Sequence, residues 1–76
     1  MNAPVSLYQF TPEITGTFAE LDEVRLMSAA RTKYGQPLQA GSEGTVLSVY
    51  ADGAAYVVEF DEGLATIKAE DLTAAN

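Results

Sequence analysis

The chain has 76 residues, of which 11 are acidic and 4 are basic, so its formal net charge is −7. It contains no cysteine, histidine or tryptophan, which excludes cysteine nucleophiles, histidine general bases and zinc sites built from Cys or His. The length allows one small domain, because an average domain has about 100–200 residues. Below about 80 residues a core rarely supplies more than ~3–5 kcal/mol of net stability, so self-association is a standing hypothesis.

The acidic balance indicates which partners suit the molecule. Nucleic-acid affinity depends on lysine and arginine, and a charge of −7 also repels anionic lipid, so a basic protein is the expected partner. The sequence lacks the run of about 20 apolar residues that spans a membrane, and its start, Met1–Pro4, lacks the basic region of a secretory signal. The absence of cysteine fits a reducing compartment. We therefore expect a cytoplasmic protein.

Residues 1–20 are predicted to form an N-terminal arm. Pro12 and Gly16 interrupt any regular element there. The arm nevertheless holds more large apolar side chains than a disordered tail normally contains, namely Val5, Leu7, Tyr8, Phe10 and Ile14. It is expected to pack on the body of the protein, as an added edge strand, or to dock on another molecule.

The remainder of the chain is typical of a small all-β domain. Residues 22–27 alternate charge with bulk, which places Val24 and Leu26 on one face of a strand. Residues 28–43 form a long excursion rich in small and turn-forming residues. Residues 44–50 are β-branched and apolar, and they predict a second strand.

Two hairpins are predicted after that strand. Asp52 and Gly53 tolerate the positive φ angles of a tight turn, and residues 56–60 return as a strand. The remaining elements are a turn over 61–63, a strand over 64–68, a helical turn over 69–72 and a frayed tail over 73–76. The spacing of these strands and turns favours a small barrel or sandwich.

Gly41 and Gly44 precede the β-branched run, and they predict a turn with unusual φ angles that starts a bent strand. We expect Gly44 to have a positive φ. Val46 and Val49 are three residues apart, and a regular strand cannot place both on one face. A β-bulge between them would do so, and bulges help small barrels to close.

Three of these segments together resemble a known family. They are Leu21–Leu26 (L-D-x-V-x-L), Gly41–Gly53 (G-x-x-G-T-V-x-x-V-Y-x-D-G) and Tyr56–Phe60 (Y-x-V-E-F). The pattern resembles a family of small bacterial proteins of unknown function with an SH3-like barrel, and more distantly KOW-type and nitrile hydratase β-subunit barrels. The resemblance implies an all-β fold: a small five-stranded, partly open barrel over residues 21–72 with one short helical turn near the C-terminus. It implies no activity.

The basic residues are unevenly placed. Arg25, Arg31 and Lys33 lie in a stretch without acidic residues. The loop over 28–40 could therefore grip an acidic partner or phosphates, or it could fold onto the acidic surface of its own domain, which is the interpretation we favour.

The aromatic residues offer a second kind of candidate site. Tyr34, Tyr50 and Tyr56, with Pro37, could form a groove for a proline-rich ligand, although Tyr56 alternates with Val58 and is expected in the core. In the arm, Leu7, Tyr8 and Phe10 are the best candidates for contact with an open strand edge or a second copy.

The paired acids do not predict a catalytic or metal site. Asp22 and Glu23 are adjacent on a strand and point to opposite faces, and the other pairs lie in turns. We expect no enzyme, cofactor or metal. The expected function is a non-enzymatic acidic protein-interaction module, neutralising a basic effector (as an antitoxin, immunity protein or inhibitor) or self-associating as a dimer. The alternatives are nucleic-acid binding through the 28–40 loop and an accessory barrel of a larger enzyme.

Overall fold

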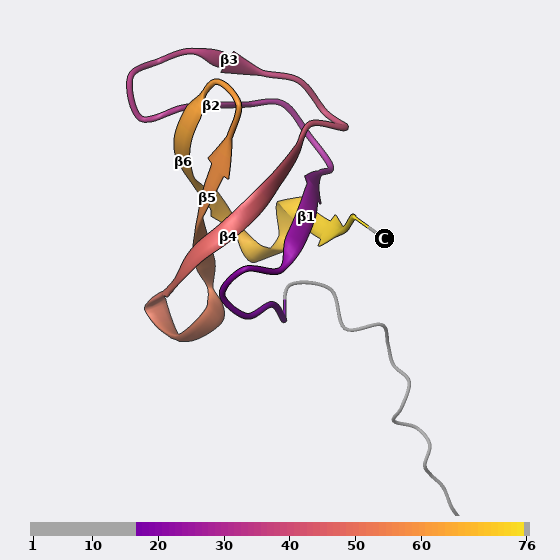
Figure 1. Cartoon of the computed structure of the whole chain (residues 1–76), viewed down its shortest axis with the longest axis vertical. Helices are drawn as coiled ribbons and strands as arrows, with labels where there is room; N and C mark the ends of the chain where they lie inside the picture. Colours follow the sequence, from indigo (N-terminus) through magenta and orange to yellow (C-terminus); the bar gives the residue numbers. More distant parts are fainter. Residues whose placement is uncertain (1–16, 76) are drawn as a thin grey trace, which may run out of the picture.

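The structure, a computed structural model, describes residues 17–75 of the chain. Its elements in chain order are β1 (Glu23–Leu26), β2 (Ala30–Arg31), β3 (Pro37–Leu38), β4 (Glu43–Tyr50), the 3₁₀ turn η1 (Ala51–Gly53), β5 (Ala55–Phe60), β6 (Gly63–Lys68), the 3₁₀ turn η2 (Ala69–Asp71) and β7 (Leu72–Ala74) (Figure 1). The predicted all-β fold is confirmed. The apolar arm residues Leu7, Tyr8 and Phe10 lie outside the described residues.

The body is one antiparallel five-stranded sheet with the strand order β6-β5-β4-β1-β7. The long strands β4 and β5 form the central hairpin. Strands β2 and β3 form a separate two-stranded hairpin that lies next to β6 in Figure 1. The Lys33 N–H joins this hairpin to β6, because it donates to the Leu64 carbonyl oxygen at 2.6 Å. The sheet is thus consistent with the small, partly open barrel that the sequence predicts, with the short helical turn η2 near its C-terminal end.

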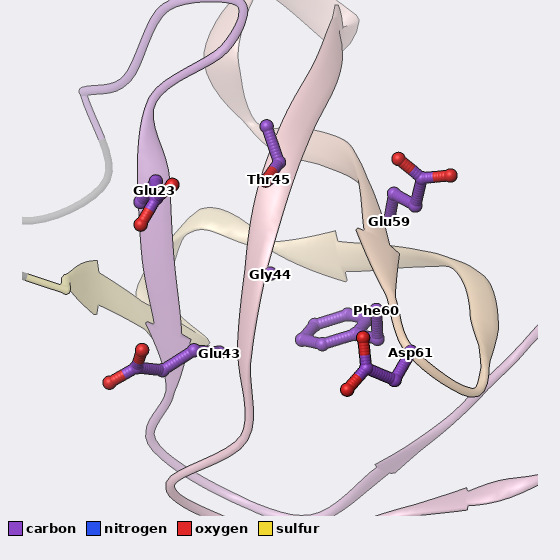
Figure 2. A pocket seen from close by; sticks show the side chains of 7 residues that line it. All are labelled: Glu23, Glu43, Gly44, Thr45, Glu59, Phe60 and Asp61. Carbon is purple, nitrogen blue, oxygen red and sulfur yellow. The ribbon is translucent and has the colours of Figure 1, made fainter.

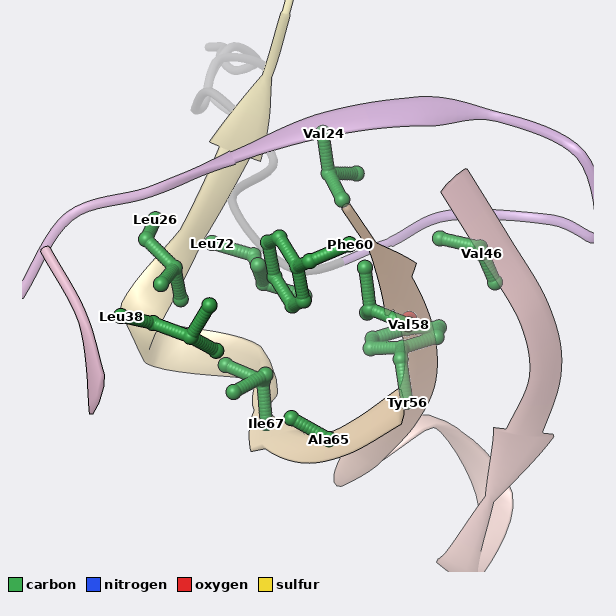
Figure 3. Close-up of a cluster of buried hydrophobic side chains, with 10 residues drawn as sticks. All are labelled: Val24, Leu26, Leu38, Val46, Tyr56, Val58, Phe60, Ala65, Ile67 and Leu72. Atoms are coloured by element: carbon green, nitrogen blue, oxygen red, sulfur yellow. The ribbon is translucent and has the colours of Figure 1, made fainter. Parts of the chain in front are cut away.

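One face of the curled sheet forms the core. The alternation of β5 directs Tyr56, Val58 and Phe60 to this face, where each is at most 4% exposed. Figure 3 shows these side chains meeting those of the other strands. The complete set of buried apolar residues is Val24, Leu26, Leu38, Val46, Tyr56, Val58, Phe60, Ala65, Ile67 and Leu72.

The predicted bulge is present in β4. Val46 pairs with Val58 and Ser48 pairs with Val57, so Leu47 is the additional residue. Because Val49 then pairs with Tyr56, the bulge places Val49 on the same face as Val46, as predicted. Val46 is fully buried, but Val49, one residue before the end of β4, is 47% exposed.

The positive φ angle expected at Gly44 is wrong. Positive φ angles occur at Gly35, Gly41, Gly53 and Gly63 but not at Gly44. At Gly44 a Cβ atom would lie 2.6 Å from the Glu59 carbonyl oxygen and 2.7 Å from Val58 Cγ1. Glycine is therefore needed here because β4 passes close to β5, whereas the unusual φ belongs to Gly41, at +94°.

The expected frayed tail is also wrong for its first residues. Thr73 pairs with Arg25 and Ala74 with Val24, so both belong to β7. The physical reason is that β1 has an open edge after β4 takes its other side, and the buried Leu72 anchors the tail beside that edge. The predicted long excursion over 28–43 contains a short hairpin of β2 and β3. This hairpin places Leu38 in the core.

Candidate functional site

Four carboxylates surround a shallow cleft on the outer face of the sheet. Glu23, Thr45 and Glu59 stand in register across β1, β4 and β5, so their side chains share this face. Glu43 and Asp61 also line this cleft, whose volume is about 450 Å³. We call the carboxylates of Glu23, Glu43, Glu59 and Asp61 the acidic face.

The carboxylates of the acidic face stand apart from one another. Figure 2 shows them arranged around Gly44, which lies between Glu43 and Thr45 on β4. Within residues 17–75 no group of three or more carboxylates is placed to hold a metal ion. The acidic face therefore presents its negative charges at separate points on one side of the sheet.

One cation lies at the edge of the acidic face. The Arg25 guanidinium donates to Glu43 Oε2 at 2.7 Å and to the Ala75 carbonyl oxygen at 3.0 Å. This is the one ion pair within the described part of the chain. Both side chains are substantially exposed, so the pair contributes only about 0.2–1 kcal/mol. Glu23, Glu59 and Asp61 form no ion pair within residues 17–75.

The structure keeps Arg31 and Lys33 of the 28–40 loop together and places Arg25 elsewhere. Arg25 lies on β1, whereas Arg31 and Lys33 lie in the β2–β3 hairpin beside β6. The Arg31 guanidinium donates to the Gly35 carbonyl oxygen at 2.9 Å, and Lys33 Nζ lies 5.6 Å from the centre of the Tyr34 ring. Arg31 and Lys33 line a second groove, of about 490 Å³.

The structure places the three tyrosines considered for a proline-binding groove in different surroundings. Tyr56 is 1% exposed and belongs to the core, as its alternation predicted. Tyr50 is 60% exposed at the hairpin end of β4, opposite Ala55. Tyr34 is 87% exposed in the β2–β3 loop, next to the start of β6. The structure therefore places Tyr34 and Tyr50 at opposite ends of the sheet.

Sequence reasoning expected an open strand edge but did not say which strand offers it. The Leu21 N–H donates to the Val46 carbonyl oxygen, and the Asp22 N–H donates to the Ala19 carbonyl oxygen. This second bond closes a turn that directs the chain away from β4. The last residues of β4 therefore have no described neighbour on the β1 side. The exposed apolar residues around this open edge are Leu21, Leu47, Val49 and Tyr50.

Comparisons with known proteins add no relative. No family model, no curated protein and no solved structure matches the chain. Over the residues that the structure describes, no helix is both long and apolar enough to cross a bilayer.

Proposed function

We propose that this protein is a non-enzymatic acidic module that binds a basic protein. The observation that carries the proposal is the acidic face, where Glu23, Glu59 and Asp61 surround an open cleft with no cation paired to them among residues 17–75. A partner with several lysine or arginine side chains would complement this arrangement and would associate faster at low ionic strength. Neutralising a basic effector, in the manner of an antitoxin, immunity protein or inhibitor, is the form of this function that we favour.

The charge distribution favours a protein over nucleic acid as the partner. Arg31 and Lys33 are the two cations of the 28–40 segment, and Arg25 is bound to Glu43. Two or three cations on a chain of net charge −7 would release few counterions from a phosphate backbone. The absence of cysteine supports a cytoplasmic location. We also propose that the chain belongs to the bacterial SH3-like family that its sequence motifs resemble.

The test removes the charge of the acidic face without changing its shape. The variant Glu23→Gln/Glu59→Gln/Asp61→Asn is compared with the control Asp52→Asn/Glu62→Gln/Glu70→Gln, which loses the same charge at other exposed positions. Each full-length chain is immobilised, exposed to extract of the native host and eluted with increasing salt. We expect the wild type and the control to retain one basic protein that salt releases, and the first variant to lose it. Equal retention by both variants, or retention that salt does not affect, would contradict the proposal.

Self-association is a second candidate function, favoured by the open edge of β4. Val49 and Tyr50 are 47% and 60% exposed beside strand backbone that has no described partner on one side, and an exposed apolar edge is a template for another strand. Light scattering tests this candidate. A dimer that Val49→Lys converts to a monomer would support it, and a monomer at all concentrations would rule it out.

A further inference from the structure

Three of the four cations of the described chain lie at one edge of the sheet. Arg25 is paired with Glu43 on the β1 side. Arg31 and Lys33 lie beside the start of β6, and Lys68 ends this strand. No carboxylate within residues 17–75 forms an ion pair with any of these three. The unpaired cations of this acidic molecule therefore lie near the two ends of a single strand, β6.

That strand has an open backbone edge. Within residues 17–75, β6 ends the sheet, with β5 as its one ladder partner. The Lys33 N–H reaches the Leu64 carbonyl oxygen from the side of β6 away from β5. Along an antiparallel strand, residues whose N–H and C=O point toward the partner strand alternate with residues whose N–H and C=O point away from it. Thr66 lies two residues after Leu64, so its N–H and C=O also point away from β5. No described strand pairs with them there.

An apolar groove runs beside this edge. Arg31 and Lys33 stand at one end of it, and its remaining lining is Thr32, Val57, Leu64, Ala65 and Thr66, around a volume of about 490 Å³. Leu64, Thr66 and Lys68 point to the same face because they alternate along β6. Lys68 is four residues after Leu64, so at about 3.3 Å per residue the two positions lie roughly 13 Å apart.

We propose that the β6 edge binds an extended acidic peptide by strand addition. The peptide backbone pairs with Thr66, an apolar side chain occupies the groove over Val57 and Leu64, and carboxylates at its two ends meet Lys33 with Arg31 and Lys68. This mode takes its affinity from the main chain and its specificity from alternate side chains. The β6 edge is separate from the acidic face. Its proposed partner is acidic, whereas the proposed partner of the acidic face is basic.

Charge complementarity and the open edge together favour this peptide over nucleic acid. A phosphate backbone would meet three cations surrounded by an excess of acidic residues and, being a hydrogen-bond acceptor, could use the N–H of Thr66 but not its C=O. A peptide strand uses both the backbone edge and the apolar groove. At about 0.15 M salt the Debye length is about 8 Å, so the nearby lysines govern the local contact more than the net charge does.

The probe is a fluorescently labelled peptide of sequence Glu-Val-Thr-Val-Glu, capped at both ends and titrated with the full chain at about 0.15 M salt. Two control peptides separate the contributions. Gln-Val-Thr-Val-Gln lacks the carboxylates, and Glu-Val-Pro-Val-Glu lacks the central N–H and the extended geometry that a strand needs. Fluorescence anisotropy should show binding of the first peptide, weaker binding of the second and none of the third. Backbone amide shifts should concentrate on Ala65–Lys68.

Protein variants locate the site. Lys33→Gln and Lys68→Gln should each weaken binding by roughly threefold, the scale of one exposed ion pair. Arg25→Gln removes the same charge at the other side of the sheet and should leave binding unchanged. Equal effects of all three variants, amide shifts away from β6, or tighter binding of a single-stranded oligonucleotide than of the acidic peptide would overturn the proposal.

Discussion

Individual backbone positions show where this small fold is under most constraint. Leu21 has a φ of +72° and is 74% exposed, a combination that is uncommon for a bulky side chain. It occupies the third position of the turn closed by the Asp22 N–H and the Ala19 carbonyl oxygen, where glycine or asparagine is usual. The turn is what releases the chain from the β4 edge.

The substitution Leu21→Gly should stabilise the isolated protein. A left-handed conformation costs an L-residue roughly 1–2 kcal/mol, and little burial compensates at this exposed position. We expect a gain of about 1 kcal/mol in the free energy of unfolding, measured by urea denaturation. Met27→Gly is the control, because Met27 is also exposed (56%) but has no positive φ. This control should lose stability, and a loss for Leu21→Gly as well would contradict the strain at the turn.

Gly44→Ala should destabilise the protein more than Gly41→Ala does. The added Cβ would meet the Glu59 carbonyl oxygen and Val58 Cγ1 at less than 3 Å, and forced packing of this kind costs about 1–3 kcal/mol. Gly41→Ala is the matched control, since Gly41 has a φ of +94° but no atom within 4 Å of the place that a methyl group would take. The control should lose only about 1–2 kcal/mol. A larger loss for Gly41→Ala than for Gly44→Ala in urea denaturation would show that φ, rather than close packing, sets the requirement.

At the scale of elements, the C-terminal strand β7 forms one edge of the five-stranded sheet. Strand β7 pairs with β1 from Leu72 to Ala74, and the Ala75 N–H donates to the Glu23 carbonyl oxygen at 3.0 Å. Ala75 also accepts a hydrogen bond from Arg25. The residues after Leu72 therefore hold the outer side of β1.

Deleting residues 73–76 should destabilise the protein. Several backbone hydrogen bonds are lost, each worth about 0.5–1.5 kcal/mol net, so a loss of about 2 kcal/mol is expected in urea denaturation. Amide exchange at Arg25 should accelerate in the truncated chain. An unchanged denaturation midpoint would mean that the tail contributes nothing to the fold.

Local chemistry explains which elements could be predicted from the sequence. The alternation of Val24 with Leu26, the Asp52-Gly53 turn and the spacing of Val46 and Val49 each reflect a local backbone rule, and the structure confirms all three. Strand β7 could not be predicted, because Thr73 and Ala74 carry no strong pattern and pair only when β1 offers an edge. The acidic face depends on the register of three strands, which no single segment encodes. The open β4 edge arises from a turn at Leu21 that residue preference disfavours.

At the scale of the whole molecule, charge is the dominant property. The net charge is −7, and the one ion pair within residues 17–75 is the exposed contact of Arg25 with Glu43. Like charges on the compact state repel one another. The acidic face concentrates part of this repulsion in one place, which a basic partner would relieve.

Salt should therefore stabilise the free protein. Raising NaCl from about 0.02 M to about 0.5 M shortens the Debye length severalfold and screens repulsion among the carboxylates more than it weakens one exposed pair. We expect a higher urea midpoint at the higher salt concentration. The variant Glu23→Gln/Glu59→Gln/Asp61→Asn should show a smaller salt effect. A midpoint that falls with salt would show that favourable ion pairs outweigh the repulsion.

The most direct test of the central claim is a titration of the ¹⁵N-labelled full chain with a hexalysine peptide, followed by amide chemical shifts. The acidic face predicts shifts that concentrate on Glu23, Thr45, Glu59 and Asp61 and that reverse when salt is added. Shifts spread evenly over all the acidic residues, or concentrated on exposed acids elsewhere such as Asp52 and Glu70, would contradict the claim that this face is the site of contact.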